Sequence, residues 1–330
     1  MKQFLQKKAK LVFLCMLVLL TCTACANPRG RDGKTLADQI IASEETTIDA
    51  SKINYKDISD KKLKKEIKKN IKDGQYTIQP TTFKDSMSKG WFEGLIVWPI
   101  AQIINLISSK IDAGVGIILT TLLIQMLVFV FTRKSQMSTQ RMQEISPEIQ
   151  KIQNKYKDKT DERSKLQMAQ EMQNLYQKYD IHPFGSMLIT FIQLPIMMGM
   201  YYATMRSVSV VSGSFMGISL AGTPLDGFKA LDIAYIAIYV LMVIFYIVSM
   251  KLPQWLKKWQ DKKDNVKVKK YAQEETNPMA NSMNMSMYFM TAMICIMYIS
   301  WPMAMSFYWL VSSVIRVCQS LILHQVMNKK

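Results

Sequence analysis

Long apolar stretches alternate with polar, basic stretches along the chain. No charged residue occurs at 113–132, 183–205, 233–250 or 276–315. About 20 apolar helical residues cross a bilayer core that is about 30 Å thick, so each stretch is long enough for a membrane helix. The pattern predicts an all-α polytopic membrane protein and excludes a single soluble globular core.

The stretch 276–315 is long enough for two spans and contains a break at Ile299-Ser300-Trp301-Pro302. Proline lacks the amide hydrogen that a helix interior needs, so a tight turn is expected there. The sequence therefore predicts five transmembrane helices. Their ranges are about 113–132, 184–205, 230–250, 281–299 and 303–323.

Residues 1–25 have the composition of an export signal. A lysine-rich start precedes the apolar run 11–20, and Thr23-Ala24-Cys25 follows. Small residues before a cysteine resemble a bacterial lipoprotein signal, in which the cysteine becomes the lipid-modified (for example palmitoylated) N-terminus. Cys25 is therefore the predicted lipidation site. An uncleaved first membrane helix is the alternative.

Two segments lie between this signal and the first span. Segment 26–90 holds 14 Lys or Arg against 10 Asp or Glu and few residues suited to a core, which predicts an extracellular, charged, mobile tether with one short helix around 61–71. Segment 91–110 has two tryptophans and a short apolar run, which favours a helix lying in the membrane interface. A kinked sixth span is the competing interpretation of 91–110.

Loop charge predicts the orientation of the spans. The formal net charge is +17, and the loops 133–182 and 251–280 carry 10 and 8 Lys or Arg, whereas 207–228 carries none. Basic loops stay on the cytoplasmic side, so these two loops and the tail 326–330 are predicted to be cytoplasmic. Segment 26–90 can still lie outside, because long segments translocate largely regardless of charge.

The first basic loop has the pattern of a helical hairpin at 137–180. Apolar residues recur every three or four positions before and after a polar turn at 157–161, so two short helices are expected to pack against each other. Pro147 either kinks the first helix or marks a false start of it. The second loop, 251–280, has basic residues and two tryptophans, which suit anionic lipid, ribosomal RNA or simply the setting of topology.

These features together resemble the YidC/Oxa family of membrane insertases, in the five-span lipoprotein form of Gram-positive bacteria. The resemblance covers about residues 90–325. It rests on the order of short motifs, which are GIILTT at 116–121, PEIQ at 147–150, KYKD at 155–158, LYQKYDIHP at 175–183, QLPI at 193–196, YFM at 288–290, YWLVSS at 308–313, and Gln319.

The chain departs from that family at two places. Gln125 stands where the family usually has an arginine in the first span, and the segment 302–304 lacks the glycine of the family's turn before the fifth span. The resemblance implies a water-filled groove, open to the cytoplasm and the lipid, that lowers the cost of moving polar segments across the membrane. It also implies a divergent member.

Polar residues inside apolar spans are the candidate groove residues, since a charge at the bilayer centre costs about 2.5–3.5 kcal/mol or more. Arg316 lies 14 residues after Pro302, and we hypothesise that it supplies the groove charge that Gln125 lacks. Snorkelling of Arg316 to the headgroups is the alternative, and Arg206 is predicted to be an interface anchor. The candidate groove set is Thr121, Gln125, Gln193, Ser312, Arg316 and Gln319.

The predicted function is therefore a membrane protein insertase and chaperone rather than an enzyme. No nucleophile–base pair and no metal-binding spacing is visible, so no cofactor is predicted. Expected partners are nascent membrane proteins and membrane lipids, with the Sec translocon and the ribosome as further candidates, and not DNA. A lipid-anchored assembly factor without insertase activity is the alternative, and a solute transporter is disfavoured because no span interior holds Asp or Glu.

Overall fold

The computed structural model describes residues 28–157, 159, 161–181, 185–263 and 278–328. The predicted signal and Cys25 lie outside these residues. The chain divides into two compact units. The first comprises Met1–Thr120, Gln193–Thr223 and Pro302–Phe307, and the second comprises Thr121–Ile192, Pro224–Trp301 and Tyr308–Lys330.

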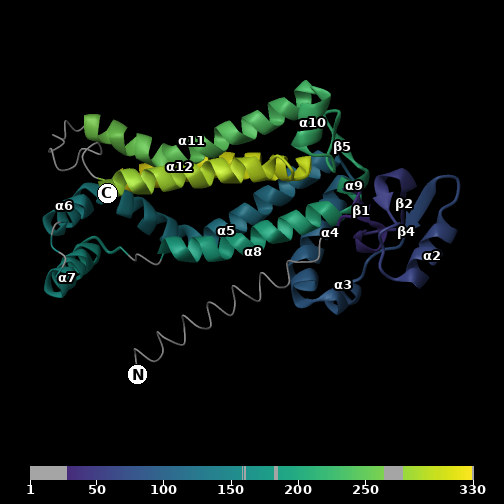
Figure 1. Cartoon of the computed structure of the whole chain (residues 1–330), viewed down its shortest axis with the longest axis horizontal. Helices are drawn as coiled ribbons and strands as arrows, with labels where there is room; N and C mark the ends of the chain where they lie inside the picture. Colours follow the sequence, from purple (N-terminus) through teal and green to yellow (C-terminus); the bar gives the residue numbers. More distant parts are fainter. Residues whose placement is uncertain (1–27, 158, 160, 182–184, 264–277, 329–330) are drawn as a thin grey trace. The chain divides into compact units, whose positions relative to one another are not determined.

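Residues 28–90, here called the N-terminal domain, contain short strands and helices (Figure 1). Strand β2 (Thr46–Asp49) pairs antiparallel with β4 (Gln75–Ile78), and β1 (Thr35–Leu36) pairs parallel with β3 (Ile53–Asn54). The helical elements are η1 (Ala37–Gln39), η2 (Ala50–Lys52), α2 (Lys61–Asn70) and α3 (Phe83–Lys89).

The prediction of a mobile tether with few core residues is wrong for this domain. Its apolar residues are scattered in a polar sequence, but strand pairing and helix α2 bring them into one cluster, which also includes two residues of α9 (Val208–Ser212). The average composition of the segment therefore led to too small a predicted hydrophobic core. The buried members are Ala37, Ile40, Ala42, Ile48, Ile53, Ile58, Ile67, Ile78, Val208 and Val211.

The predicted short helix of this domain is confirmed as α2. Asp60 caps its start, because the carboxylate accepts hydrogen bonds from the backbone N–H of Lys62 at 2.8 Å and of Leu63 at 3.3 Å. Ile67 is 2% exposed and Leu63 packs beside it, so the helix turns one apolar stripe into the core.

Segment 91–110 is helical, as predicted. The π-helical turn η3 (Glu93–Val97) leads without a break into α4 (Trp98–Ser108), whose second residue is Pro99. Ile100, Ala101, Ile104 and Asn105 are buried. Whether α4 lies in the membrane interface or forms a sixth span stays a prediction.

Three helices are long and apolar enough to cross a membrane among the described residues, over Ala113–Met142, Ile233–Gln260 and Met303–Val326. Two further helices of 22 and 21 residues lie where the second and fourth spans were predicted. The count of five spans stays a prediction. The five helices are α5 (Ala113–Glu144), α8 (Gly185–Arg206), α11 (Ile233–Lys263), α12 (Pro278–Tyr298) and α13 (Met303–Asn328).

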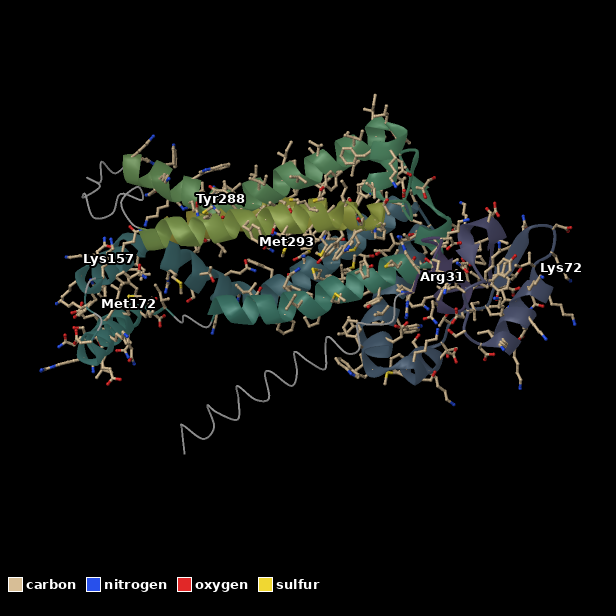
Figure 2. The ribbon with its side chains drawn as sticks, in the orientation of Figure 1. Arg31, Lys72, Lys157, Met172, Tyr288 and Met293 are labelled. Carbon is tan, nitrogen blue, oxygen red and sulfur yellow. The ribbon has the colours of Figure 1, made fainter. Side chains whose placement is uncertain are left out.

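The predicted break near Pro302 is confirmed, because α12 ends at Tyr298 and α13 begins at Met303. Helix α11 continues through Pro253 to Lys263, so the first half of the predicted loop 251–280 is helical. Helices α11 and α12 run side by side: Lys251 Nζ donates to Tyr288 Oη at 2.6 Å, and the Tyr239 hydroxyl donates to the Cys295 carbonyl at 2.6 Å (Figure 2).

The predicted hairpin forms, with a changed first half. Helix α5 runs on to Glu144, and Pro147 lies in the first turn of a new helix, α6 (Ser146–Tyr156), so the proline marks a start rather than a kink. The partner helix is α7 (Glu162–Lys178). Ile145, Leu175 and Ile181 form the buried core between them.

One ion pair ties the far end of this hairpin together. Lys155 Nζ lies 2.5 Å from Glu171 Oε1, and the Tyr156 hydroxyl donates to the same oxygen at 2.9 Å. Bonding to Lys155 and then Tyr156 lowers the pKa of the Glu171 carboxyl. The carboxylate form of Glu171 is therefore the one that fits the hairpin.

Short elements connect α9 to α11. Strands β5 (Ser214–Phe215) and β6 (Ile218–Ser219) form a hairpin in which Met216 and Gly217 both have positive φ. A two-residue turn of that kind matches the twist of paired strands. Helix α10 (Pro224–Ala230) follows.

We expect Ile67→Ala in the full chain to lower the free energy of unfolding of the N-terminal domain by about 2–4 kcal/mol, because it leaves a cavity under α2. Hydrogen exchange of the β2 and β4 amides measures this loss. Lys68→Ala, at the exposed neighbour, should change it by no more than about 0.5 kcal/mol. Equal exchange in all three proteins would contradict a packed core.

Candidate functional site

Two predicted groove residues are paired in the second unit, between α5 and α13. Gln125 Nε2 donates to Ser312 Oγ at 3.1 Å, and the two residues are 5% and 0% exposed. A buried amide in apolar surroundings costs free energy unless it is hydrogen-bonded. The bond therefore explains how each helix can hold a polar residue among apolar ones, and it holds the two helices at one register.

More buried polar groups lie next to this pair. Thr121, one helical turn before Gln125, is fully buried, and so is Ser313 beside Ser312. Gln319 is half-buried on α13. The buried face of α13 and the facing turn of α5 are thus richer in hydroxyl and amide groups than the exposed face of α5, where Leu123, Met126 and Leu127 are found.

Arg316 belongs to the same helix but has different neighbours. Its Nη2 donates to Ser313 Oγ at 2.9 Å, and its guanidinium carbon lies 5.9 Å from the ring centre of Tyr246 on α11 and 5.6 Å from that of Trp309. Tyr298 stacks on Trp309 with ring centres 4.9 Å apart. Cation–π contacts stabilise a desolvated guanidinium, so an aromatic cluster holds Arg316.

Among the described residues, Arg316 has no carboxylate in ion-pair distance, and the buried indole Nε1 of Trp309 has no acceptor. A guanidinium has five N–H donors, of which the Ser313 bond uses one. The region around Arg316 therefore offers hydrogen-bond donors in excess of acceptors, and the chemical group that suits it is a carboxylate or a carbonyl.

The aromatic residues of this cluster are absent from the predicted site. Tyr246, Tyr298 and Trp309 come from three helices, so no local spacing connects them. Trp309 and Arg316 are seven residues apart and share a helix face, which is the one sequence signal that could have indicated the contact.

Two further predicted site residues lie outside the second unit's described residues. Gln193 is half-buried on α8 and belongs to the first unit. Cys25 lies outside the described residues. No group of three or more His, Cys, Asp or Glu within the described ranges could hold a metal ion.

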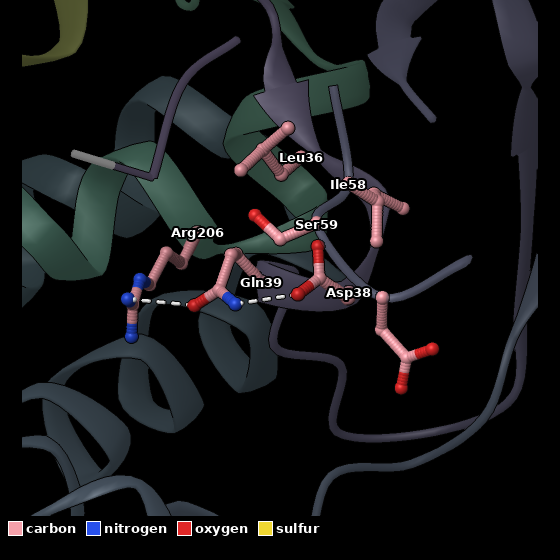
Figure 3. Close-up of a pocket in the computed structure, with 7 residues that line it drawn as sticks. Leu36, Asp38, Gln39, Ile58, Ser59 and Arg206 are labelled. Carbon is pink, nitrogen blue, oxygen red and sulfur yellow. Dashed lines mark hydrogen bonds between the residues drawn. The ribbon is translucent and has the colours of Figure 1, made fainter. Parts of the chain in front are cut away.

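Arg206 is not the interface anchor that was predicted. It is 5% exposed, forms an ion pair with Glu93, and donates from Nη2 to Gln39 Oε1 at 2.8 Å. Figure 3 shows Arg206, Gln39 and Asp38 joined by hydrogen bonds at a pocket of about 340 Å³ in the first unit. Gln39 of the N-terminal domain and Glu93 bind the Arg206 guanidinium in place of a lipid headgroup. This explains why Arg206 is buried and not exposed at an interface.

The backbone beside Arg206 is bound by the N-terminal domain as well. Ile41 N–H donates to the Arg206 carbonyl at 2.7 Å, and the Ile41 carbonyl accepts from Val208 N–H at 3.0 Å and from Asn105 Nδ2 at 2.8 Å. The Ser207 hydroxyl donates to Asn105 Oδ1 at 2.6 Å. Ile41 thus provides hydrogen-bond partners for the backbone at the end of α8. Asn105 links α4 to Ile41 and to Ser207, the residue after α8.

A double-mutant cycle on Gln125→Ala and Ser312→Ala should give a coupling free energy of about 0.5–1.5 kcal/mol in the unfolding of the full chain in detergent, since the two groups share one buried hydrogen bond. A matched cycle of Gln125→Ala with Gln319→Ala should give a coupling near zero. Additive effects of Gln125→Ala and Ser312→Ala would show that the bond does not form.

The chain is similar to known proteins over most of its length. The profile of the 60Kd inner membrane protein family matches residues 104–330. The chain is 30% identical over 237 residues to membrane protein insertase YidC 1 of Streptococcus pyogenes serotype M6, covering 72% of this chain and 75% of that protein.

Two other relatives have similar identity and coverage. Membrane protein insertase YidC of Enterococcus faecalis is 30% identical over 72% of this chain and 76% of its own length. Membrane protein insertase YidC 1 of Listeria monocytogenes serotype 4b is 29% identical over 77% of this chain and 78% of its own. With its apolar helices and the match over 104–330, the chain belongs to the 60Kd inner membrane protein family, the YidC/Oxa family of multi-pass membrane proteins.

Proposed function

We propose that this protein is a membrane protein insertase and chaperone that helps polar segments of other membrane proteins to cross and fold. Relatives over most of its length carry the name membrane protein insertase. The observation that carries the proposal is the polar set on facing helices α5 and α13, in which Gln125 and Ser312 are bonded. Polar side chains inside apolar helices lower the cost of a passing polar segment.

Arg316 is the proposed cation of this groove, in place of the arginine that Gln125 replaces. Its lack of a carboxylate partner among the described residues leaves its charge available to an acidic segment of a substrate. The rings of Tyr246 and Trp309 support a desolvated cation without neutralising it. Thr121, Gln193 and Gln319 are proposed to line the same path.

The remaining parts of the proposal concern the setting of the chain in the membrane. Cys25 is lipid-modified, the N-terminal domain lies outside, and the hairpin α6–α7 and the C-terminus are cytoplasmic. The distribution of Lys and Arg supports this orientation. The Sec translocon and the ribosome are the further candidate partners.

Replacement of the host's own insertase tests this function. When that insertase is depleted, expression of this chain should restore growth and the insertion of a reporter membrane protein. Normal expression and topology without rescue would favour the alternative, a lipid-anchored assembly factor that does not insert proteins.

Arg316→Ala should slow insertion of a reporter with an acidic translocated tail roughly fivefold, the effect of losing about 1 kcal/mol of charge interaction, and leave a reporter with a neutral tail unchanged. Arg316→Lys should retain most of the rate. Lys262→Ala, which removes one exposed charge, is the matched control. If Arg316→Ala inserts both reporters like the wild type, Arg316 is a snorkelling residue.

A further inference from the structure

Helix α2 of the N-terminal domain has an unusual density of positive charge. Six lysines and one glutamate lie between Lys61 and Asn70, which gives the helix a net charge of +5. We propose that α2 is a docking surface for acidic polypeptide segments that have reached the outer side of the membrane. This inference rests on the proposed insertase function and on the proposed orientation.

The fold holds these lysines outward in a fixed arrangement. Leu63 and Ile67 pack into the core of the domain, and Asp60 caps the helix. The side chains of Lys61, Lys62, Lys65, Lys68 and Lys69 are exposed. Lys72, just beyond the helix, also points away from the domain (Figure 2). These lysines therefore lie on the surface of a folded helix and not on the charged, unstructured tether that composition alone suggests.

The arrangement opposes one local preference of helices. Lys61 and Lys65, Lys64 and Lys68, and Lys65 and Lys69 are like charges four residues apart, and such pairs destabilise a helix. Asp60, the helix cap, supplies negative charge at the N-terminal end but does not neutralise the lysines along the helix. Sequences that break local rules in this way do so most often at functional sites.

Two nearby carboxylates, Asp57 and Asp60, bind other groups of the domain. Asp57 accepts from the backbone N–H of Arg31 at 2.8 Å and from Asn54 Nδ2 at 2.8 Å, and Asp60 is the helix cap. The bonds to Arg31 and Asn54 lower the pKa of Asp57, so it is ionised and already satisfied at neutral pH. The surface therefore has excess positive charge that an acidic partner would neutralise.

A polypeptide fits this surface better than the lipid bilayer does. An interfacial helix inserts its apolar face, but the apolar residues of α2 are inside the domain core. Strand β4 contacts α2, and its partner β2 contacts α9, so the β2–β4 pair lies between α2 and the element that follows α8 (Figure 1). Segments that membrane proteins export are poor in Lys and Arg, so their acidic residues are left unbalanced and complement a cationic helix.

Peptide binding to the full chain in discs of zwitterionic lipid tests the proposal. The probe is a fluorescent peptide of alternating Glu and Ser, and the matched probe has Gln for Glu. The wild type should bind the Glu peptide at low salt and lose it as salt rises. The variant Lys61→Gln/Lys65→Gln/Lys68→Gln should bind roughly tenfold more weakly, since three exposed charge contacts together contribute about 1.5 kcal/mol.

A control variant carries the same change of charge at exposed lysines elsewhere, Lys157→Gln/Lys165→Gln/Lys262→Gln, and should bind like the wild type. Hydrogen exchange of β4 verifies that both variants are folded. Equal binding by the α2 variant and the wild type overturns the proposal, and so does binding of inorganic polyphosphate without binding of the Glu peptide. The binding assay does not depend on membrane insertion. If the chain binds the Glu peptide but does not restore growth, the result contradicts the insertase function and leaves the proposed docking surface standing.

Discussion

Buried backbone N–H and C=O groups must find partners within the protein, and the described fold follows from this requirement. Inside α5, α11 and α13 the partners are one helical turn away. At the end of α8 they are supplied by the N-terminal domain, where Ile41 bonds to the carbonyl of Arg206 and to the amide of Val208. A segment far away in the sequence therefore completes the hydrogen bonding at the end of helix α8.

The same requirement applies to polar side chains, and the chain meets it in three ways. Gln125 and Ser312 pair as neutral groups, which costs little. Arg206 and Glu93 pair as charges, an arrangement in which the loss of either partner leaves a buried charge uncompensated. Arg316 is held by aromatic rings and one hydroxyl. Of these three arrangements, that of Arg316 leaves a charge that no carboxylate among the described residues neutralises.

Periodicity and charge predicted the helices well because a helix depends on residues close in sequence. The break before Met303, the hairpin and the short helix α2 follow from such local patterns. The core of the N-terminal domain does not, because Ile48, Ile53 and Ile78 meet only through strand pairing. The surroundings of Arg206 and Arg316 were missed for the same reason: Glu93 and Tyr246 lie more than 60 residues from the arginines that they contact.

Ile145 alone separates α5 from α6. Since α5 has 32 residues, it is about 48 Å long, whereas a bilayer core is about 30 Å thick. The hairpin is thus attached directly to a long helix rather than through a linker of several residues. A displacement of the hairpin is therefore passed through a single residue to the helix that carries Gln125.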